Sequence, residues 1–193
     1  MEFRSAIDTT LRSAATLQSA IANDAKIIGN IEAIITKLVD TYKAGNKVLF
    51  CGNGGSAADA QHLAAELSGK FYIDRPPLAA EALHVNTSFI TAVGNDYSFE
   101  EIYARNLSAL GKKGDVLFAM TTSGNSMNII KALQRAKEID ISTVVFTGQN
   151  NGNVDQFADL LIKIPSTDTP RIQEGHLLIG HIICEQVEKA LFS

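Results

Sequence analysis

Residues 47–56 read Lys-Val-Leu-Phe-Cys-Gly-Asn-Gly-Gly-Ser, an apolar run that enters a glycine-rich turn. The turn opens directly into Ala57-Ala58-Asp59-Ala60-Gln61, which is typical of the start of a helix. A buried strand, a short loop and a helix N-terminus therefore follow one another. Backbone N–H groups in such a turn point outward, and the helix dipole adds positive potential. The segment predicts a binding site for an anion.

A titratable pair follows one turn into the predicted helix. His62 and Glu66 are spaced i, i+4, which places them about 40° apart on one face of a helix. An anion site beside an imidazole and a carboxylate is typical of an enzyme that acts on a phosphorylated small molecule.

A second segment repeats this design. The apolar run at 115–120 enters Thr121-Thr122-Ser123-Gly124-Asn125-Ser126, and helical periodicity resumes over 127–133. Such residues also gather in ordinary turns. Two such loops, each after a strand of the buried type, favour a phosphate site built from hydroxyls and backbone N–H groups. The sequence contains no G-x-x-x-x-G-K-[ST] and no G-x-G-x-x-G, which argues against nucleoside triphosphates and dinucleotides.

Strands and helices alternate after the N-terminal region, which predicts a doubly wound α/β fold. Its mostly parallel, five-stranded sheet is expected in the flavodoxin-like order 2-1-3-4-5, with two extra helices before it. Both polar loops then meet at the switch point between the first and third strands. We expect one domain over 1–193, with a helical arm at 1–45 and an α/β core at 46–193. The expected strands are 47–51, 79–83, 115–120, 143–147 and 160–164; the expected helices include 3–22, a second capped by Asp24 and ended by Gly45, 86–94, 99–110, and 170–192 with Thr169 as N-cap.

Composition narrows the class of protein. The chain has 193 residues, 46% of them apolar and 20% charged, which is typical of a globular domain. Its net charge of -4 and lack of a basic run argue against a nucleic-acid partner. The first five residues do not resemble a signal peptide, and no apolar stretch is long enough to span a membrane. The two distant cysteines fit a reducing compartment, so a cytoplasmic location is expected.

The last predicted helix and the pair Asn95-Asp96 also contain candidate site residues, and each of these has an ordinary structural interpretation as well. Gln173 and His181 on the last predicted helix are about 80° apart around the axis and about 12 Å apart along it. They can approach one ion only if both lean inward, and His181 lies in an apolar run where a core histidine is the usual reading. Asn95-Asp96 reads most simply as a turn, but could present an amide and a carboxylate to sugar hydroxyls.

The motifs together resemble the phosphoheptose isomerases (sedoheptulose-7-phosphate isomerases), and the resemblance extends over essentially the whole chain. They are the Cys-Gly-Asn-Gly-Gly-Ser run at 51–56 with His62 and Glu66, Val93-Gly94-Asn95-Asp96, the loop at 121–126, and Arg-Ile-Gln-Glu-Gly-His at 171–176.

The resemblance implies a sugar-isomerase domain and a homotetramer with active sites between subunits. It implies conversion of D-sedoheptulose 7-phosphate to D-glycero-D-manno-heptose 7-phosphate through a cis-enediol, as the first step toward the heptoses of lipopolysaccharide and related glycans. It assigns proton transfer to Glu66 and His181, and zinc to His62, Glu66, Gln173 and His181. The implied substrate contacts are Glu66, Asn53, Gly54, Gly55, Ser56, Asn95, Asp96, Thr121, Thr122, Ser123, Ser126 and Gln173.

Two positions depart from the family pattern. Lys70 stands where many relatives have arginine, and the two side chains are not interchangeable at a bidentate contact. Thr121 stands where serine is usual, which keeps the hydroxyl.

Three alternative functions stay open, one of them a sensor that binds a phosphosugar without turnover. A related branch binds the bacterial replication initiator and is not an enzyme, but it lacks the glutamate and the late histidine that this chain has. Other phosphosugar isomerases, such as arabinose-5-phosphate isomerase, usually carry a further regulatory domain, whereas this sequence ends at Ser193.

Overall fold

The computed structural model describes residues 3–193; Met1 and Glu2, part of the segment compared above with a signal peptide, lie outside the described residues. Its sheet has five parallel strands in the order β2-β1-β3-β4-β5, which confirms the predicted topology. The strands are β1 (Val48–Gly52), β2 (Ala80–Ala82), β3 (Val116–Met120), β4 (Ser142–Thr147) and β5 (Leu160–Lys163). Since β1 and β3 are neighbours, the two polar loops leave the sheet at the same point.

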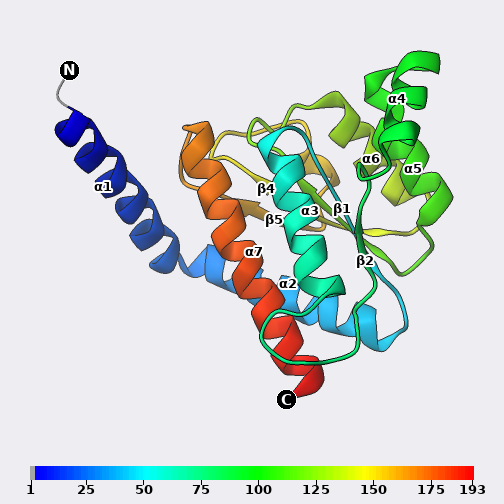
Figure 1. Ribbon diagram of the computed structural model, residues 1–193, viewed down its shortest axis with the longest axis horizontal. Helices are drawn as coiled ribbons and strands as arrows, with labels where there is room; N and C mark the ends of the chain where they lie inside the picture. Colours follow the sequence, from blue (N-terminus) through cyan, green and yellow to red (C-terminus); the bar gives the residue numbers. More distant parts are fainter. Residues whose placement is uncertain (1–2) are drawn as a thin grey trace.

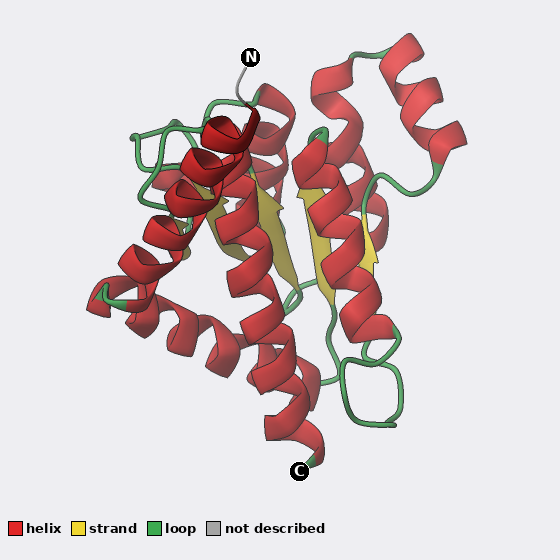
Figure 2. Ribbon diagram, turned by 60° about the vertical axis from the view of Figure 1, so that its left-hand side comes forward, coloured by secondary structure: helices red, strands yellow, loops and turns green. Residues whose placement is uncertain are grey.

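Helices cover both faces of the sheet (Figure 2). One apolar cluster joins the sheet to α1, α2, α3 and α7, and a second joins its other face to α4, α5 and α6. The helices are α1 (Phe3–Ala22), α2 (Ala25–Lys43), α3 (Gly55–Ser68), α4 (Thr87–Asp96), α5 (Ile102–Leu110), α6 (Met127–Glu138) and α7 (Thr169–Phe192), with short 3₁₀ turns at η1 (Phe99–Glu101) and η2 (Asp155–Phe157).

The strands supply the centre of both clusters because their successive side chains point to opposite faces. Phe50 and Phe118 face the α3 and α7 side, where their rings stack 5.1 Å apart. Leu49 and Leu117 face the α5 and α6 side. Both faces are buried, which explains why the strands read as continuous apolar runs rather than as alternating ones.

Helix ends agree with the sequence in one case and differ in two. Asp24 caps α2, accepting hydrogen bonds from the N–H groups of Lys26 and Ile27. The turn predicted at Asn95-Asp96 is wrong, because α4 continues through both residues. The N-cap of α7 is Asp168 rather than Thr169, since Asp168 has the extended backbone of a cap and Thr169 is already helical.

Helix α1 extends away from the rest of the molecule (Figure 1). Only Leu17 and Ile21, near its C-terminal end, are buried. Phe3, Ile7 and Leu11 are 70%, 58% and 65% exposed, although their i, i+4, i+8 spacing places them on one face. Among the helices of residues 3–193, none combines the length and the apolar character needed to cross a bilayer.

Candidate functional site

Three helices begin around one small cavity at the carboxyl ends of β1 and β3. The cavity has a volume of about 200 Å³. It is bounded by the first turns of α3, α6 and α7, whose N–H groups have no partner within their own helix. Three helix dipoles therefore place positive potential on the same volume. Its lining residues are Asn53, Ser56, Met120, Thr121, Thr122, Ser126, Thr169 and Gln173.

The turn before α3 depends on its glycines. Gly54 has φ +55°, a conformation that residues with a side chain rarely adopt. A Cβ on Gly52 would lie 2.4 Å from the Ser56 carbonyl oxygen, and one on Gly55 would lie 2.4 Å from the Gln173 amide nitrogen. The turn thus lets the backbone of α3 and the side chain of Gln173 approach the same point.

Side chains tie the two polar loops together. Asn53 and Asn128 exchange two amide hydrogen bonds of 2.8 Å each, which joins the loop after β1 to α6. The hydroxyls of Thr121 and Ser126 lie 3.3 Å apart within the second loop. Because Asn53 is engaged by Asn128, the anion-binding capacity of the first loop lies chiefly in its N–H groups and in Ser56.

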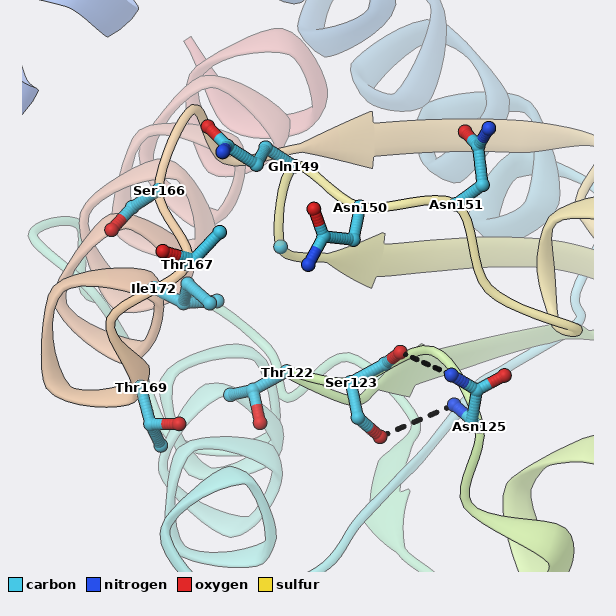
Figure 3. Close-up of a pocket in the computed structure, with 11 residues that line it drawn as sticks. Thr122, Ser123, Asn125, Gln149, Asn150, Asn151, Ser166, Thr167, Thr169 and Ile172 are labelled. Atoms are coloured by element: carbon cyan, nitrogen blue, oxygen red, sulfur yellow. Dashed lines mark hydrogen bonds between the residues drawn. The ribbon is translucent and has the colours of Figure 1, made fainter.

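A larger polar crevice adjoins this cavity (Figure 3). It has a volume of about 400 Å³ and shares Thr122 and Thr169 with the small cavity. The loops after β3 and β4 and the loop before α7 surround it, and its side chains are mostly amides and hydroxyls. Ser123 opens onto this crevice, where its hydroxyl oxygen and its carbonyl oxygen both accept hydrogen bonds from Asn125.

A titratable cluster lies farther along α3. The Nε2 atoms of His62 and His181 are 2.8 Å apart, and His62 Nε2 is 3.2 Å from Glu66 Oε1. The two imidazole rings have centroids 5.0 Å apart. His62 lies six residues after Ser56, which corresponds to about 9 Å along the helix axis. The cluster is open to solvent, since the His62 side chain is 47% exposed and that of Glu66 is 25% exposed.

The donor set of this cluster fits a divalent metal. One donor atom from each of His62, Glu66 and His181 lies within 4.8 Å of the others. Two imidazole nitrogens and a carboxylate oxygen are ordinary zinc ligands. When both imidazoles are neutral, two Nε2 atoms facing each other at 2.8 Å need a proton or a cation between them. A zinc ion would satisfy both nitrogens at once.

Asp59 lies one turn before His62 on α3. Burial raises the pKa of Asp59, and the nearby His62 partly opposes this. Its Oδ2 atom is buried without a hydrogen-bond partner among the described residues. The cluster thus has a second carboxyl group beside it, one that burial disfavours in its ionised form.

The structure groups most of the predicted site residues and separates two. Gln173 lies against Gly55 at the cavity end of α3. Asn95 and Asp96 are exposed on α4, which lies well away from α7 in Figure 1. Lys70 is exposed in the segment that follows α3. Within one chain, therefore, α4 does not contribute to the cavity or to the cluster.

Sequence reasoning missed four residues that shape this region. Asn128 holds Asn53, while Phe71, Arg75 and Glu188 pack around the far ends of α3 and α7. An asparagine in the first turn of α6 was a weak signal for Asn128. Arg75 and Glu188 are 113 residues apart, and neither lies in a recognisable motif. For Glu188, the hint that the sequence offered was a glutamate that follows the apolar run of the last helix.

Comparison with known proteins identifies relatives over more than nine tenths of the chain. Residues 11–148 match the SIS domain family. A phosphoheptose isomerase of Clostridium acetobutylicum is 49% identical over 186 residues, covering 96% of this chain and 95% of its own. One from Mycobacterium tuberculosis is 50% identical over 177 residues, covering 92% and 90%. The structure of a phosphoheptose isomerase from Francisella tularensis superposes with a TM-score of 0.94 at 34% identity, covering 98% and 100%.

Proposed function

This chain belongs to the phosphoheptose isomerase family of SIS-domain proteins and is an isomerase, and from this premise we propose that it converts D-sedoheptulose 7-phosphate to D-glycero-D-manno-heptose 7-phosphate. The product would serve heptose biosynthesis, including that of lipopolysaccharide. The observation that carries the proposal is the arrangement along α3: an anion cavity at its first turn and a His-Glu-His cluster about two turns farther on.

The cavity holds the phosphate group in this proposal. Helix N-termini and hydroxyls bind phosphate without a lysine, as the convergence of α3, α6 and α7 supports. The separation of about 9 Å between Ser56 and His62 lets a phosphate on carbon 7 sit in the cavity while the opposite end of the sugar reaches the cluster. Phosphate-free sedoheptulose is therefore expected to bind much more weakly.

The cluster performs the proton transfers. Glu66 removes a proton from carbon 1 of the ketose while His181 donates a proton to the carbonyl oxygen on carbon 2, which gives a cis-enediol. The proton on the oxygen of carbon 1 then returns to His181, and Glu66 delivers a proton to carbon 2. The product is the aldose, and both side chains regain their starting states.

We propose that zinc is held by His62, Glu66 and His181. The family resemblance implies Gln173 as a fourth ligand, but in this chain its side chain lies against Gly55, about two helical turns from the cluster. When bound, zinc supplies polarisation of the carbonyl group and stabilises developing negative charge. A carboxylate that binds metal is a weaker base, and an imidazole that binds metal through Nε2 carries no proton on that atom. Glu66 and His181 therefore cannot be fully effective as ligand and as proton carrier at the same time.

We also propose that the chain assembles as a homotetramer and that α4 of one subunit supplies Asn95 and Asp96 to the site of another. The exposed apolar face of α1 supports assembly, as does a groove of about 730 Å³ between α2 and α7 that is lined in part by Ile28, Ile31, Ile35 and Ile182. The solvent-open His-Glu-His cluster supports a site completed by a neighbour. The whole of 1–193 acts as one domain in this proposal.

Incubation with D-sedoheptulose 7-phosphate tests the function directly. The parent protein is expected to form the aldose and to incorporate deuterium from D₂O into the sugar, because the carbon-bound proton passes through Glu66. Glu66→Gln is expected to lower turnover by about 10²- to 10⁴-fold, the usual contribution of a general base. Metal analysis of the parent protein is expected to give about one zinc per chain.

Glu185→Gln is the matched control, because it makes the same change to a carboxylate of α7 that pairs with Lys189 outside the cluster. It is expected to keep parental turnover. Full activity of a folded Glu66→Gln variant would remove Glu66 as the base. A parent protein that binds the sugar phosphate without forming any aldose would contradict the isomerase proposal.

A further inference from the structure

A segment after α3, residues 69–76, passes beside the C-terminal half of α7 (Figure 1). We call it the strap. The carboxylate of Glu188 on α7 is buried, with 1% of its side chain exposed. It accepts three hydrogen bonds from backbone N–H groups of the strap, from Phe71 at 2.9 Å, Tyr72 at 2.6 Å and Ile73 at 2.9 Å. One side chain of α7 thus holds three consecutive strap residues.

The guanidinium group of Arg75 completes the connection. Its Nε donates to Glu188 Oε1 at 2.9 Å, and its side chain is also 1% exposed. The terminal nitrogens donate to carbonyl groups at the end of α3, where helical carbonyls have no partner within the helix. The accepting carbonyls there are those of Glu66 at 3.1 Å, Leu67 at 2.8 Å and Gly69 at 3.1 Å, and the guanidinium group also donates to the Pro76 carbonyl of the strap at 3.1 Å.

The strap touches the proposed reaction centre at two places. Arg75 bonds the backbone carbonyl of Glu66 itself. The centroid of the Phe71 ring lies 5.8 Å from that of the His181 ring. The His62 ring packs against the same histidine. The base and the acid are therefore each in contact with a residue of the strap, and Glu188 anchors both contacts.

We propose that Arg75 and Glu188 are positioning residues that fix Glu66 on α3 against His181 on α7, an inference that rests on the proposed function. Neither side chain contacts the cavity. They act by holding the strap, and the strap fixes the positions of the C-terminal end of α3 and of the His181 ring. Small misplacements of reacting groups are costly, since 1 Å can reduce a rate by about 10²-fold.

The electrostatics agree with a tightly held pair. Burial alone would raise the pKa of Glu188, but the three N–H groups and Arg75 lower that pKa to about 2. The carboxylate therefore stays ionised at every pH at which the enzyme would work.

Glu188→Gln tests the inference, because it preserves shape but places an amide group against backbone N–H groups. We expect kcat to fall by about 10- to 100-fold with little change in KM, and the affinity for Zn²⁺ alone, titrated into metal-free protein, to fall by a similar factor. Arg75→Lys keeps the charge but loses the fork that reaches the α3 carbonyls, so both losses should be smaller than in Arg75→Met.

Asp115→Asn is the matched control. Asp115 is another fully buried carboxylate; it accepts hydrogen bonds from the N–H groups of Lys47 and Lys112 and pairs with the Lys47 ammonium group, so its partners lie in the segments before β1 and β3 rather than in α3, α7 or the strap. We expect it to lower thermal stability as Glu188→Gln does, while kcat and Zn²⁺ affinity stay parental at temperatures where both variants are folded.

The outcomes separate the two proposals. Parental kcat and Zn²⁺ affinity in folded Glu188→Gln would overturn the positioning role, as would equal losses in Asp115→Asn. If Glu188→Gln does not fold, Arg75→Lys and Phe71→Leu decide the question by the same two measurements. A parent protein without isomerase activity would refute the proposed function, yet the Zn²⁺ titrations would still test whether the strap organises the cluster.

Discussion

His176 is a fully buried histidine whose ring packs 5.6 Å from that of Phe146. Burial lowers the pKa of His176 to about 4, although a hydrogen bond with the Thr147 carbonyl group opposes the shift. Its Nδ1 atom is buried without a hydrogen-bond partner within residues 3–193. The folded protein therefore keeps this imidazole neutral at pH values where the unfolded chain protonates it.

The pKa difference predicts how stability depends on pH. An unfolded histidine titrates near 6.5, so its contribution is fully present above that pH and is lost as the pH falls toward about 4. The loss is up to about 3 kcal/mol, one pKa unit being worth 1.36 kcal/mol. We expect the free energy of unfolding of His176→Gln, measured by urea denaturation, to depend less on pH between these values than that of the parent protein. A parental slope in the variant would show that another group causes the dependence.

At the scale of single residues, the sequence was most informative where the chain makes a compact motif. The His62 and Glu66 spacing predicted a shared face, and the structure places both beside His181. It could not predict which side chains satisfy one another across the fold. The amide exchange of Asn53 with Asn128 spans 75 residues and leaves no periodic pattern.

The packing of α3 against α7 depends on Gly180. A Cβ at this position would lie 2.5 Å from Leu63 Cδ1 and 2.7 Å from Leu63 Cδ2, and Leu63 is buried. Leu63 directly follows His62, and Gly180 directly precedes His181. The contact between them therefore sets the distance between the two histidines. We expect Gly180→Ala to destabilise the protein by about 1–3 kcal/mol through overpacking, and to lower turnover by about tenfold or more through displacement of the histidines.

Gly29→Ala provides the comparison. Gly29 is in the interior of α2, and apart from the nearby backbone of its own helix its Cβ would meet no described atom within 4 Å. It is expected to stabilise the protein by about 0.5–1 kcal/mol, the usual gain of alanine over glycine in a helix. The stability of both variants is measured by thermal denaturation, and their activity by turnover of the sugar phosphate. Parental stability and activity in Gly180→Ala would mean that α3 and α7 tolerate a wider separation.

Whole elements were easier to predict than their ends. The two apolar runs at 47–51 and 115–120 placed β1 and β3 side by side because each opens into a polar loop and a helix. The predicted end of α4 was wrong, because Gly94 and Asn95 suggest a turn whereas the helix continues to Asp96. The strap was missed for a different reason: its order comes from Glu188, which lies more than a hundred residues away.

The whole molecule has an element that a single chain does not explain. Helix α1 extends from the body and exposes Phe3, Ile7 and Leu11 along one face. Within residues 3–193 of one chain this face has no packing partner, which supports the assembly proposed above. Asn95 and Asp96 lie far from the cluster in the same chain, so assembly would serve the site as well as stability.

The double variant Ile7→Glu with Leu11→Glu tests this view, because two carboxylates on the apolar face oppose burial. We expect its mass, measured by light scattering after gel filtration, to fall below that of the parent protein, and its turnover to fall in parallel. Ser5→Glu with Thr9→Glu adds the same charges about half a turn away and should keep the parental mass and activity. An unchanged mass in the first variant would exclude the α1 face as an interface. Smaller assemblies with full turnover would show that the site needs no neighbour, and would leave Asn95 and Asp96 without a role in catalysis.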